Sequence, residues 1–127
     1  MSRSSTRPTD AELAILRVLW NRGPCTVRQV HEALAESRDT GYTTTLKLMQ
    51  IMAEKGLVSR DESARTHVYA AGVSEADTQQ RLVTDLMDRA FGGSAAQLVM
   101  RALSSQEPSE EELSAIRQLI ERYREES

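Results

Sequence analysis

The side chains that most often serve catalysis or metal binding are few and scattered in this chain. There are two histidines, His31 and His67, and a single cysteine, Cys25. Metal ligands normally occur as clustered Cys and His at short spacing, and these three residues are not so arranged. No pair of carboxylates marks a cleft, and the glycines form no phosphate-binding signature. The sequence therefore predicts no enzyme, no metal site and no cofactor, and Cys25 is interpreted as a small turn residue rather than a redox sensor.

A different chemistry is offered by residues 41–52, "GYTTTLKLMQIM", whose apolar residues have helical spacing. The stripe expected to be buried, at positions i, i+3, i+4 and i+7, consists of Thr45, Leu48, Met49 and Met52. The other face presents, among its polar residues, Thr43, Thr44, Lys47 and Gln50. We interpret this polar face as a candidate surface for contact with DNA.

The residue types on this face suit a nucleic acid. Helix N-termini present free amides and a partial positive charge, which favour phosphate. The short hydroxyl side chains of Thr43 and Thr44 allow the backbone to approach closely, and threonine can also contact a thymine methyl group. Lys47 can meet a phosphate or a guanine, and Gln50 an adenine edge. Two plainer interpretations remain open: Thr43 is only an N-cap and Thr44 faces solvent, while Lys47 and Gln50 belong to an ordinary solvated surface.

The elements that would position these residues are mostly helices. Four stretches, "TDAE", "TVRQ", "SAAQ" and "SEEE", match the capping box, in which a Ser or Thr and a Glu or Gln three residues later satisfy each other's backbone amides. With the apolar spacing they predict helices at about residues 10–21, 27–36, 43–55, 75–91, 95–103 and 110–124. Between the third and fourth helices, "LVSRD" and "THVYA" are short and rich in β-branched and aromatic residues, and they predict a β-hairpin.

Three helices followed by a hairpin are the order of a winged helix-turn-helix, in which the third helix enters the major groove and the hairpin, or wing, lies on the phosphate backbone. The predicted fold class is therefore mainly α. We expect a winged-helix DNA-binding domain at residues 1–73 and a dimerisation domain of three helices at residues 74–127. The phosphate candidates on the wing are Arg60, Arg65 and His67. Arg28, in the second helix, is a further candidate, although it also fits a simple surface charge.

The two predicted domains differ in charge. Residues 1–73 carry ten Lys/Arg against eight Asp/Glu, a balance of +2, and residues 74–127 carry six against eleven, a balance of −5. This asymmetry favours contact of the first part alone with a polyanion. The C-terminal helices also carry more apolar side chains than so short a segment can bury alone. The predicted dimerisation residues are Leu82, Leu86, Phe91, Leu98, Val99, Leu103, Leu113, Ile116, Leu119, Ile120 and Tyr123. The alternative is packing of these helices onto the winged helix of the same chain.

Four stretches carry a more specific signal. "PTDAELAILRVLW", "TVRQVHEAL", "GYTTTLKLMQIMAEKGLVSR" and "ARTHVYAAGVS" resemble, in this order, segments of the BlaI/MecI family of bacterial repressors of antibiotic resistance, and "AAQLVMRALSSQEPSEEELSAIRQLIE" does so more loosely. The resemblance implies an N-terminal winged helix, a C-terminal helical dimerisation domain and binding to palindromic operators. It also places Thr43, Thr44 and Lys47 on the DNA-reading helix and Arg65 on the wing.

The chain departs from the family pattern at three places. Ile51 stands where family members often carry Arg, which removes one implied phosphate contact. In the best-known members a membrane-bound sensor protease triggers cleavage at an Asn-Phe bond, and the aligned pair here is Arg101-Ala102. The copper-responsive relatives end in a cysteine-rich tail, whereas this chain ends "RYREES". The resemblance implies a sensor protease as a further partner, but induction by cleavage at that bond is not expected here. Direct induction by metal is not expected either.

The N-terminal "MSRSSTRPT" lacks the apolar core of a signal peptide, and no apolar run approaches the roughly 20 residues that span a bilayer. The lone cysteine suits a reducing compartment. The sequence therefore predicts a cytoplasmic homodimeric repressor that binds double-stranded DNA at a palindromic operator, has no membrane contact and is relieved by an unidentified signal. The alternative, from a different class, is a winged helix used as a protein-interaction module, with the acidic helices as its docking surface.

Overall fold

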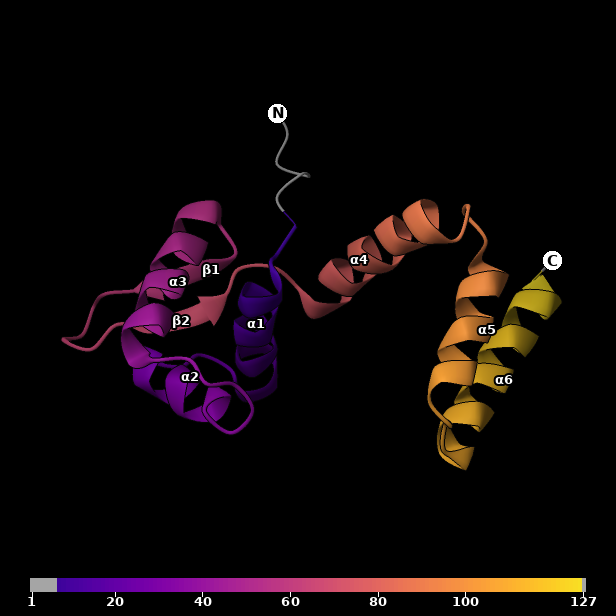
Figure 1. The fold of residues 1–127 in the computed structure, drawn as a ribbon, viewed down its shortest axis with the longest axis horizontal. Helices are drawn as coiled ribbons and strands as arrows, with labels where there is room; N and C mark the ends of the chain where they lie inside the picture. The colour runs from indigo at the N-terminus through magenta and orange to yellow at the C-terminus, as the bar shows by residue number, and fades with distance from the viewer. Residues whose placement is uncertain (1–6, 127) are drawn as a thin grey trace. The chain divides into compact units, whose positions relative to one another are not determined.

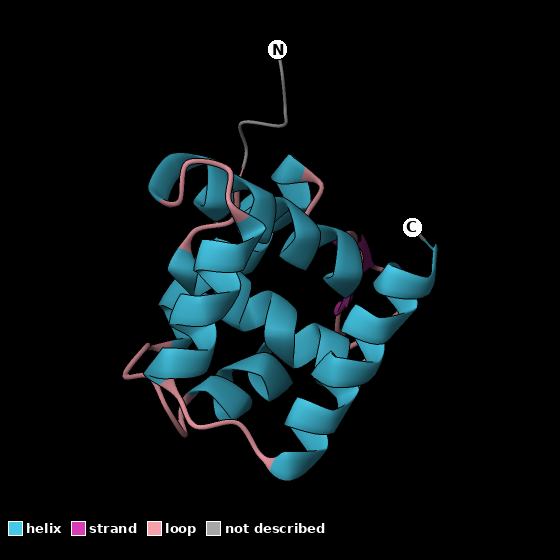
Figure 2. Cartoon of the chain, turned by 90° about the vertical axis from the view of Figure 1, so that its right-hand side faces the viewer, coloured by secondary structure: helices cyan, strands magenta, loops and turns pink. Residues whose placement is uncertain are grey.

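The computed structural model describes residues 7–126, and its elements follow the predicted order (Figure 1). The first five elements are α1 (Asp10–Arg22), α2 (Val27–Leu34), α3 (Tyr42–Lys55), β1 (Val58–Asp61) and β2 (Val68–Ala71). Three further helices are α4 (Glu75–Ala90), α5 (Ala95–Ser105) and α6 (Glu110–Glu126). Helices dominate the chain, and the two strands form a small antiparallel sheet (Figure 2). The predicted fold class, a mainly α winged helix-turn-helix with a hairpin wing, is confirmed.

The helix starts follow the capping signals in the sequence. Reciprocal capping boxes form at Thr9–Glu12, Thr26–Gln29 and Ser109–Glu112. At the start of α5, the Ser94 side chain accepts a hydrogen bond from the Gln97 amide at 3.1 Å. The start of α3 is different, because its N-cap is Gly41, which offers no side chain to the first turn. Thr43 is therefore not the N-cap, and the helix begins one residue earlier than predicted, at Tyr42.

The core of the winged helix lies between α1, α2, α3 and the hairpin. Its buried apolar residues are Ile15, Leu16, Leu19, Cys25, Val27, Val30, Leu34, Met49, Met52, Leu57, Val58 and Tyr69. In α1 the inward residues are Ile15, Leu16 and Leu19, whereas Val18 and Trp20 are only half-buried. Helical spacing from Leu16 explains the difference, because Leu19 lies three residues on and shares its face.

The hairpin is completed by a third chain segment. β1 pairs with β2 in the register Val58 with Ala71 and Arg60 with Tyr69. On the other side of β2, the Cys25 amide donates to the Tyr69 carbonyl at 2.9 Å and the Tyr69 amide donates to the Cys25 carbonyl at 2.8 Å. The turn before α2 therefore behaves as a one-residue strand. It holds the buried Tyr69 ring, which is 1% exposed, in the centre of the core.

The chain leaves the winged helix through residues that are tied to it. The Trp20 indole Nε1 donates to the Val73 carbonyl at 3.0 Å, and Thr78, in the second turn of α4, is buried. The structure divides into two compact units between Leu82 and Val83, inside α4. The sequence placed its domain boundary between residues 73 and 74, and that assignment stays a prediction.

The second unit has almost no interior of its own. α5 and α6 contain no buried residue, and Thr78, the buried residue of α4, lies in the part of α4 that belongs to the first unit. In the part of the chain that the structure describes, no helix combines the length and the apolar character needed to cross a lipid bilayer.

Candidate nucleic-acid interface

The polar face of α3 is fully presented to solvent. Its residues Thr43, Thr44, Lys47 and Gln50 are all exposed. Thr43, Lys47 and Gln50 follow one another at i, i+4 and i+7, so their side chains lie along one side of the helix, with Thr44 beside them. The structure therefore brings together all four α3 residues that the sequence marked for DNA contact. Their role in DNA binding stays a prediction.

The opposite face of α3 is anchored in the core. Thr45, Met49 and Met52 are buried as predicted, and Leu48 is half-buried. The Thr45 hydroxyl donates to the Gly41 carbonyl at 3.2 Å, four residues back. This bond satisfies the polar atom of a buried side chain inside its own helix. Of the three consecutive threonines, Thr45 thus fixes the first turn of α3, whereas Thr43 and Thr44 face outward.

The wing presents the predicted cations with different surroundings. Arg65 and His67 lie in the exposed turn between β1 and β2. Arg60 lies on β1, where its guanidinium Nε is 2.6 Å from Glu62 Oε2. A hydrogen bond with the Tyr69 side chain and the Glu62 carboxylate together raise the pKa of Arg60. Arg60 therefore already has partners within its own chain, and a phosphate would have to compete with them.

A small aromatic cluster, which no pattern in the sequence indicated, joins the starts of α2 and α3. Tyr42 is the first residue of α3 and is 41% exposed. The guanidinium carbon of Arg28 lies 5.5 Å from the centroid of the Tyr42 ring. The His31 ring approaches the same tyrosine, with centroids 5.8 Å apart and planes crossing at 86°. Tyr42 was missed because the helix was expected to start after it.

The far end of α3 is held by an ion pair whose carboxylate is buried. Lys55 Nζ lies 2.8 Å from Glu12 Oε2, and the other Glu12 oxygen accepts from the Thr9 amide at 3.0 Å. Glu12 is only 2% exposed. Burial raises the pKa of Glu12, but the hydrogen bonds from Lys55 and Thr9 and the charge of Lys55 outweigh it, so the pKa lies below its usual value. The pair links the end of α3 to the start of α1.

The Lys55→Met variant should lose about 1–3 kcal/mol of unfolding free energy at neutral pH, because it leaves a buried carboxylate without its main partner. The lowered pKa of Glu12 means that its contribution to stability is present above the usual carboxyl range and is lost as the pH falls through the folded-state value. In Lys55→Met, burial dominates and the pKa rises, so acid should destabilise the variant less than the parent. Urea titrations across the acidic range measure both effects.

Glu54→Gln is the matched control for this experiment. It removes an exposed carboxylate from the same helix, one position away, and should change neither the stability nor its dependence on pH by much. Equal stability of Lys55→Met and the parent at neutral pH would contradict a structural role for the pair.

The apolar residues of the second unit lie largely on the surface of the single chain. Among the predicted dimerisation residues, those with exposed side chains are Leu86 (50%), Val99 (42%), Leu103 (36%), Leu119 (45%), Ile120 (50%) and Tyr123 (65%). The others, Leu82, Phe91, Leu98, Leu113 and Ile116, are half-buried. Val83 and Met100, which the prediction did not include, are 43% and 62% exposed.

The remaining sequence features have clear locations. Arg101 and Ala102 lie inside α5, and both are exposed. Ala102 also lines a shallow depression with residues of the α5–α6 turn and the first turns of α6. Over residues 7–126, no group of three or more His, Cys, Asp or Glu is arranged to hold a metal ion.

Comparison with known proteins gives consistent results. A family model described as penicillinase repressor matches residues 8–122. The transcriptional regulator BlaI of Mycobacterium tuberculosis is 38% identical over 96 residues, which cover 75% of this chain and 70% of that protein. The penicillinase repressor of Bacillus licheniformis is 22% identical over 116 residues, or 91% of each chain. The solution structure of the DNA-binding domain of the repressor BlaI aligns with a TM-score of 0.49 and 23% identity, over 54% of this chain and 84% of that one.

Proposed function

The chain belongs to the penicillinase repressor family, and from this premise we propose that it is a homodimeric repressor that binds a palindromic operator and is released by a signal. The family consists of DNA-binding transcriptional repressors and not of enzymes, which agrees with the prediction from the sequence. DNA is accordingly the partner of the winged helix. We further propose that the protein acts in the cytoplasm, where bacterial DNA lies.

The observation that carries the proposal is the composition and exposure of one helical face. Thr43, Thr44, Lys47 and Gln50 are exposed together on α3, the helix that enters the major groove in winged-helix proteins. Short hydroxyls, one cation and one amide are the groups that read phosphates and base edges. The buried Thr45, Met49 and Met52 behind them support this assignment, because a rigid helix positions such groups better than a loop does.

Support for a dimer comes from the second unit. Large apolar residues on each of α4, α5 and α6 are exposed in the single chain, and exposed apolar surface of that kind marks interaction sites. We propose that they pack against the same helices of a second copy. A twofold dimer presents two α3 helices with matching symmetry, so its operator would be a palindrome whose half-sites lie one or more helical turns apart.

The signal for release is proposed to differ from that of the best-known relatives. The Arg101-Ala102 pair, which the family resemblance aligns with the Asn-Phe bond, lies inside a regular helix. A protease requires an extended segment, so α5 would have to unfold locally before cleavage. We propose that any signal that separates the two copies would relieve repression, because a single winged helix retains only half of the contacts with DNA.

Footprinting on the DNA upstream of the protein's own gene tests the proposed function. The expected result is protection of a palindromic sequence, with two half-sites on the same face of the duplex. Salt-sensitive binding without any sequence preference would overturn the repressor assignment. It would favour the alternative, a winged helix whose acidic helices dock another protein.

Lys47→Ala should weaken operator binding and flatten its dependence on salt. Each phosphate contact contributes about 0.9 to the slope of log affinity against log salt concentration, so the slope should fall by about one unit for each protomer bound. Gel-shift titrations at several salt concentrations give both values. Arg17→Ala removes an equal charge from an exposed position on α1 and should leave the slope unchanged. An unaltered affinity and slope for Lys47→Ala would remove Lys47 from the interface.

A further inference from the structure

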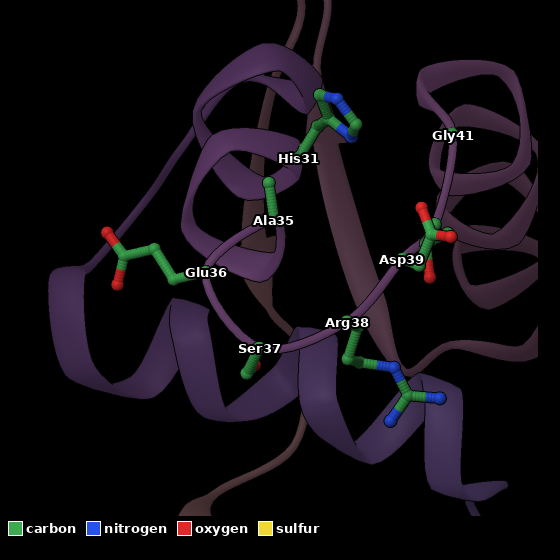
Figure 3. Close-up of a pocket in the computed structure, with 8 residues that line it drawn as sticks. His31, Ala35, Glu36, Ser37, Arg38, Asp39 and Gly41 are labelled. Carbon is green, nitrogen blue, oxygen red and sulfur yellow. The ribbon is translucent and has the colours of Figure 1, made fainter.

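The segment that joins α2 to α3 does not by itself fix the start of α3. Residues 35–41 follow the last turn of α2 without forming a helix or a strand, and they line an open depression with His31 (Figure 3). In this segment, the Ser37 and Arg38 amides both donate to the Leu34 carbonyl at the end of α2, at 3.0 and 2.7 Å. Gly41, which has no side chain, provides no cap for the first turn of α3. Besides the buried residues of α3 itself, the side chains that contact this turn from α2 therefore contribute to its position.

Tyr42 supplies this connection through two residues of α2. Arg28 and His31 are three positions apart, so they project from the same face of α2. The Arg28 guanidinium carbon lies 5.5 Å from the centroid of the Tyr42 ring, within the range of a cation–π contact. The His31 ring meets the Tyr42 ring edge to face, with ring centroids 5.8 Å apart, an arrangement that aromatic rings prefer. The tyrosine ring thus touches both ends of one helical turn of α2.

His31 and Arg28 differ in burial and in their polar contacts, and this difference separates their roles. His31 Nδ1 is buried and has no hydrogen-bond partner among the described residues, so its ring contributes packing against the tyrosine. Arg28 is exposed, and across residues 7–126 no carboxylate lies within ion-pair distance of it. No ion pair with a residue of the described part of the chain therefore neutralises its charge. This charge lies beside the helix start that carries Thr43 and Thr44.

We propose that Tyr42 is a positioning residue that holds the Arg28 guanidinium in place to bind a phosphate of the operator, next to the first turn of α3. The inference rests on the proposed function and adds a residue that neither the sequence pattern nor the exposed face of α3 indicated. An arginine held against a ring has lost most of its rotamer freedom before binding. Its phosphate contact therefore costs less conformational entropy than that of a free surface arginine.

The test is a double-mutant cycle on operator affinity with the full-length protein, using Arg28→Ala, Tyr42→Leu and the combined variant. Tyr42→Leu should lower the affinity of the dimer about fivefold to thirtyfold, the effect of losing two exposed cation–π contacts. The slope of log affinity against log salt concentration for Tyr42→Leu should move toward the slope measured for Arg28→Ala. In the Arg28→Ala background, Tyr42→Leu should have little further effect, because the group that it positions is gone.

Tyr42→Phe is the matched control, since it keeps the ring and removes only the hydroxyl. It should restore both the affinity and the salt slope of the parent. Thermal unfolding monitored by circular dichroism checks that each variant is folded. Tyr42→Gln, a good helix former without a ring, repeats the test if the leucine variant is not folded.

Two outcomes would overturn the inference while leaving the repressor assignment intact. The first is additive losses from Arg28→Ala and Tyr42→Leu, which would show that the two residues act independently. The second is a Tyr42→Leu variant that binds more weakly with an unchanged salt slope, which would give Tyr42 a purely structural role. Failure of the parent protein to prefer its operator over random DNA would instead refute the proposed function, which separates the two failures.

Discussion

Ile120→Glu should convert the protein into a monomer with a folded winged helix and an operator affinity reduced about 100-fold or more. Ile120 is 50% exposed in the single chain, so a charge there costs little before association. In the proposed dimer the same position is buried, and by symmetry the substitution places two unpaired carboxylates in the interface. The separated winged helices lose the effective concentration that couples the two half-sites, which is worth about 10²–10⁴ in affinity.

Gln118→Glu is the matched control for Ile120→Glu. It adds the same charge two residues away, on the side of α6 opposite the apolar face, where Gln118 is exposed. Sedimentation equilibrium should show a dimer for this variant and a monomer for Ile120→Glu, with the melting of the winged helix unchanged in both. A dimeric Ile120→Glu protein with parental operator affinity would show that this face of α6 lies outside the interface.

Tyr69→Ala should destabilise the winged helix by about 3–5 kcal/mol, the usual cost of removing a buried aromatic ring from a core. Tyr69 is 1% exposed, its strand pairs with β1 on one side, and its own amide and carbonyl bond to Cys25 on the other. These bonds prevent the strand from collapsing into the cavity. Because small domains are stable by only about 5–15 kcal/mol, the variant should melt far below the parent. Thermal and urea unfolding measure the difference.

Tyr69→Phe separates the ring from its hydroxyl. It removes the hydrogen bond with Arg60 and keeps the buried ring, so it should retain most of the parental stability. A small loss for Tyr69→Ala, comparable with that for Tyr69→Phe, would show that the ring is not central to the core.

Local sequence signals were sufficient for the order and type of the elements. Capping boxes act over three residues and apolar stripes over seven, so α1, α3 and the hairpin could be read directly from the chain. The division of the threonines followed from the same periodicity, with Thr45 inward and Thr43 and Thr44 outward. The assignment of DNA contacts to the outward residues stays a prediction.

Features that depend on distant partners could not be read in this way. Glu12 matched a capping box, but the ion pair of its buried carboxylate requires Lys55, which lies 43 residues away in the sequence. Cys25 was interpreted as a turn residue, and its pairing with Tyr69 depends on the way in which the hairpin folds back. The cluster around Tyr42 combines side chains from two helices. Each of these contacts depends on tertiary packing, which periodicity within one element does not reveal.

The absence of buried residues from α5 and α6 has a consequence for how the protein unfolds. The winged helix has its own core, so its melting temperature should be independent of the amount of protein present. In the proposed dimer the C-terminal helices gain an interior by association, and mass action then makes their stability rise with protein concentration. A single two-state transition would not describe such a dimer. At low abundance, as when synthesis of the protein has just begun, the C-terminal helices would remain exposed to cellular proteases until a second copy is available.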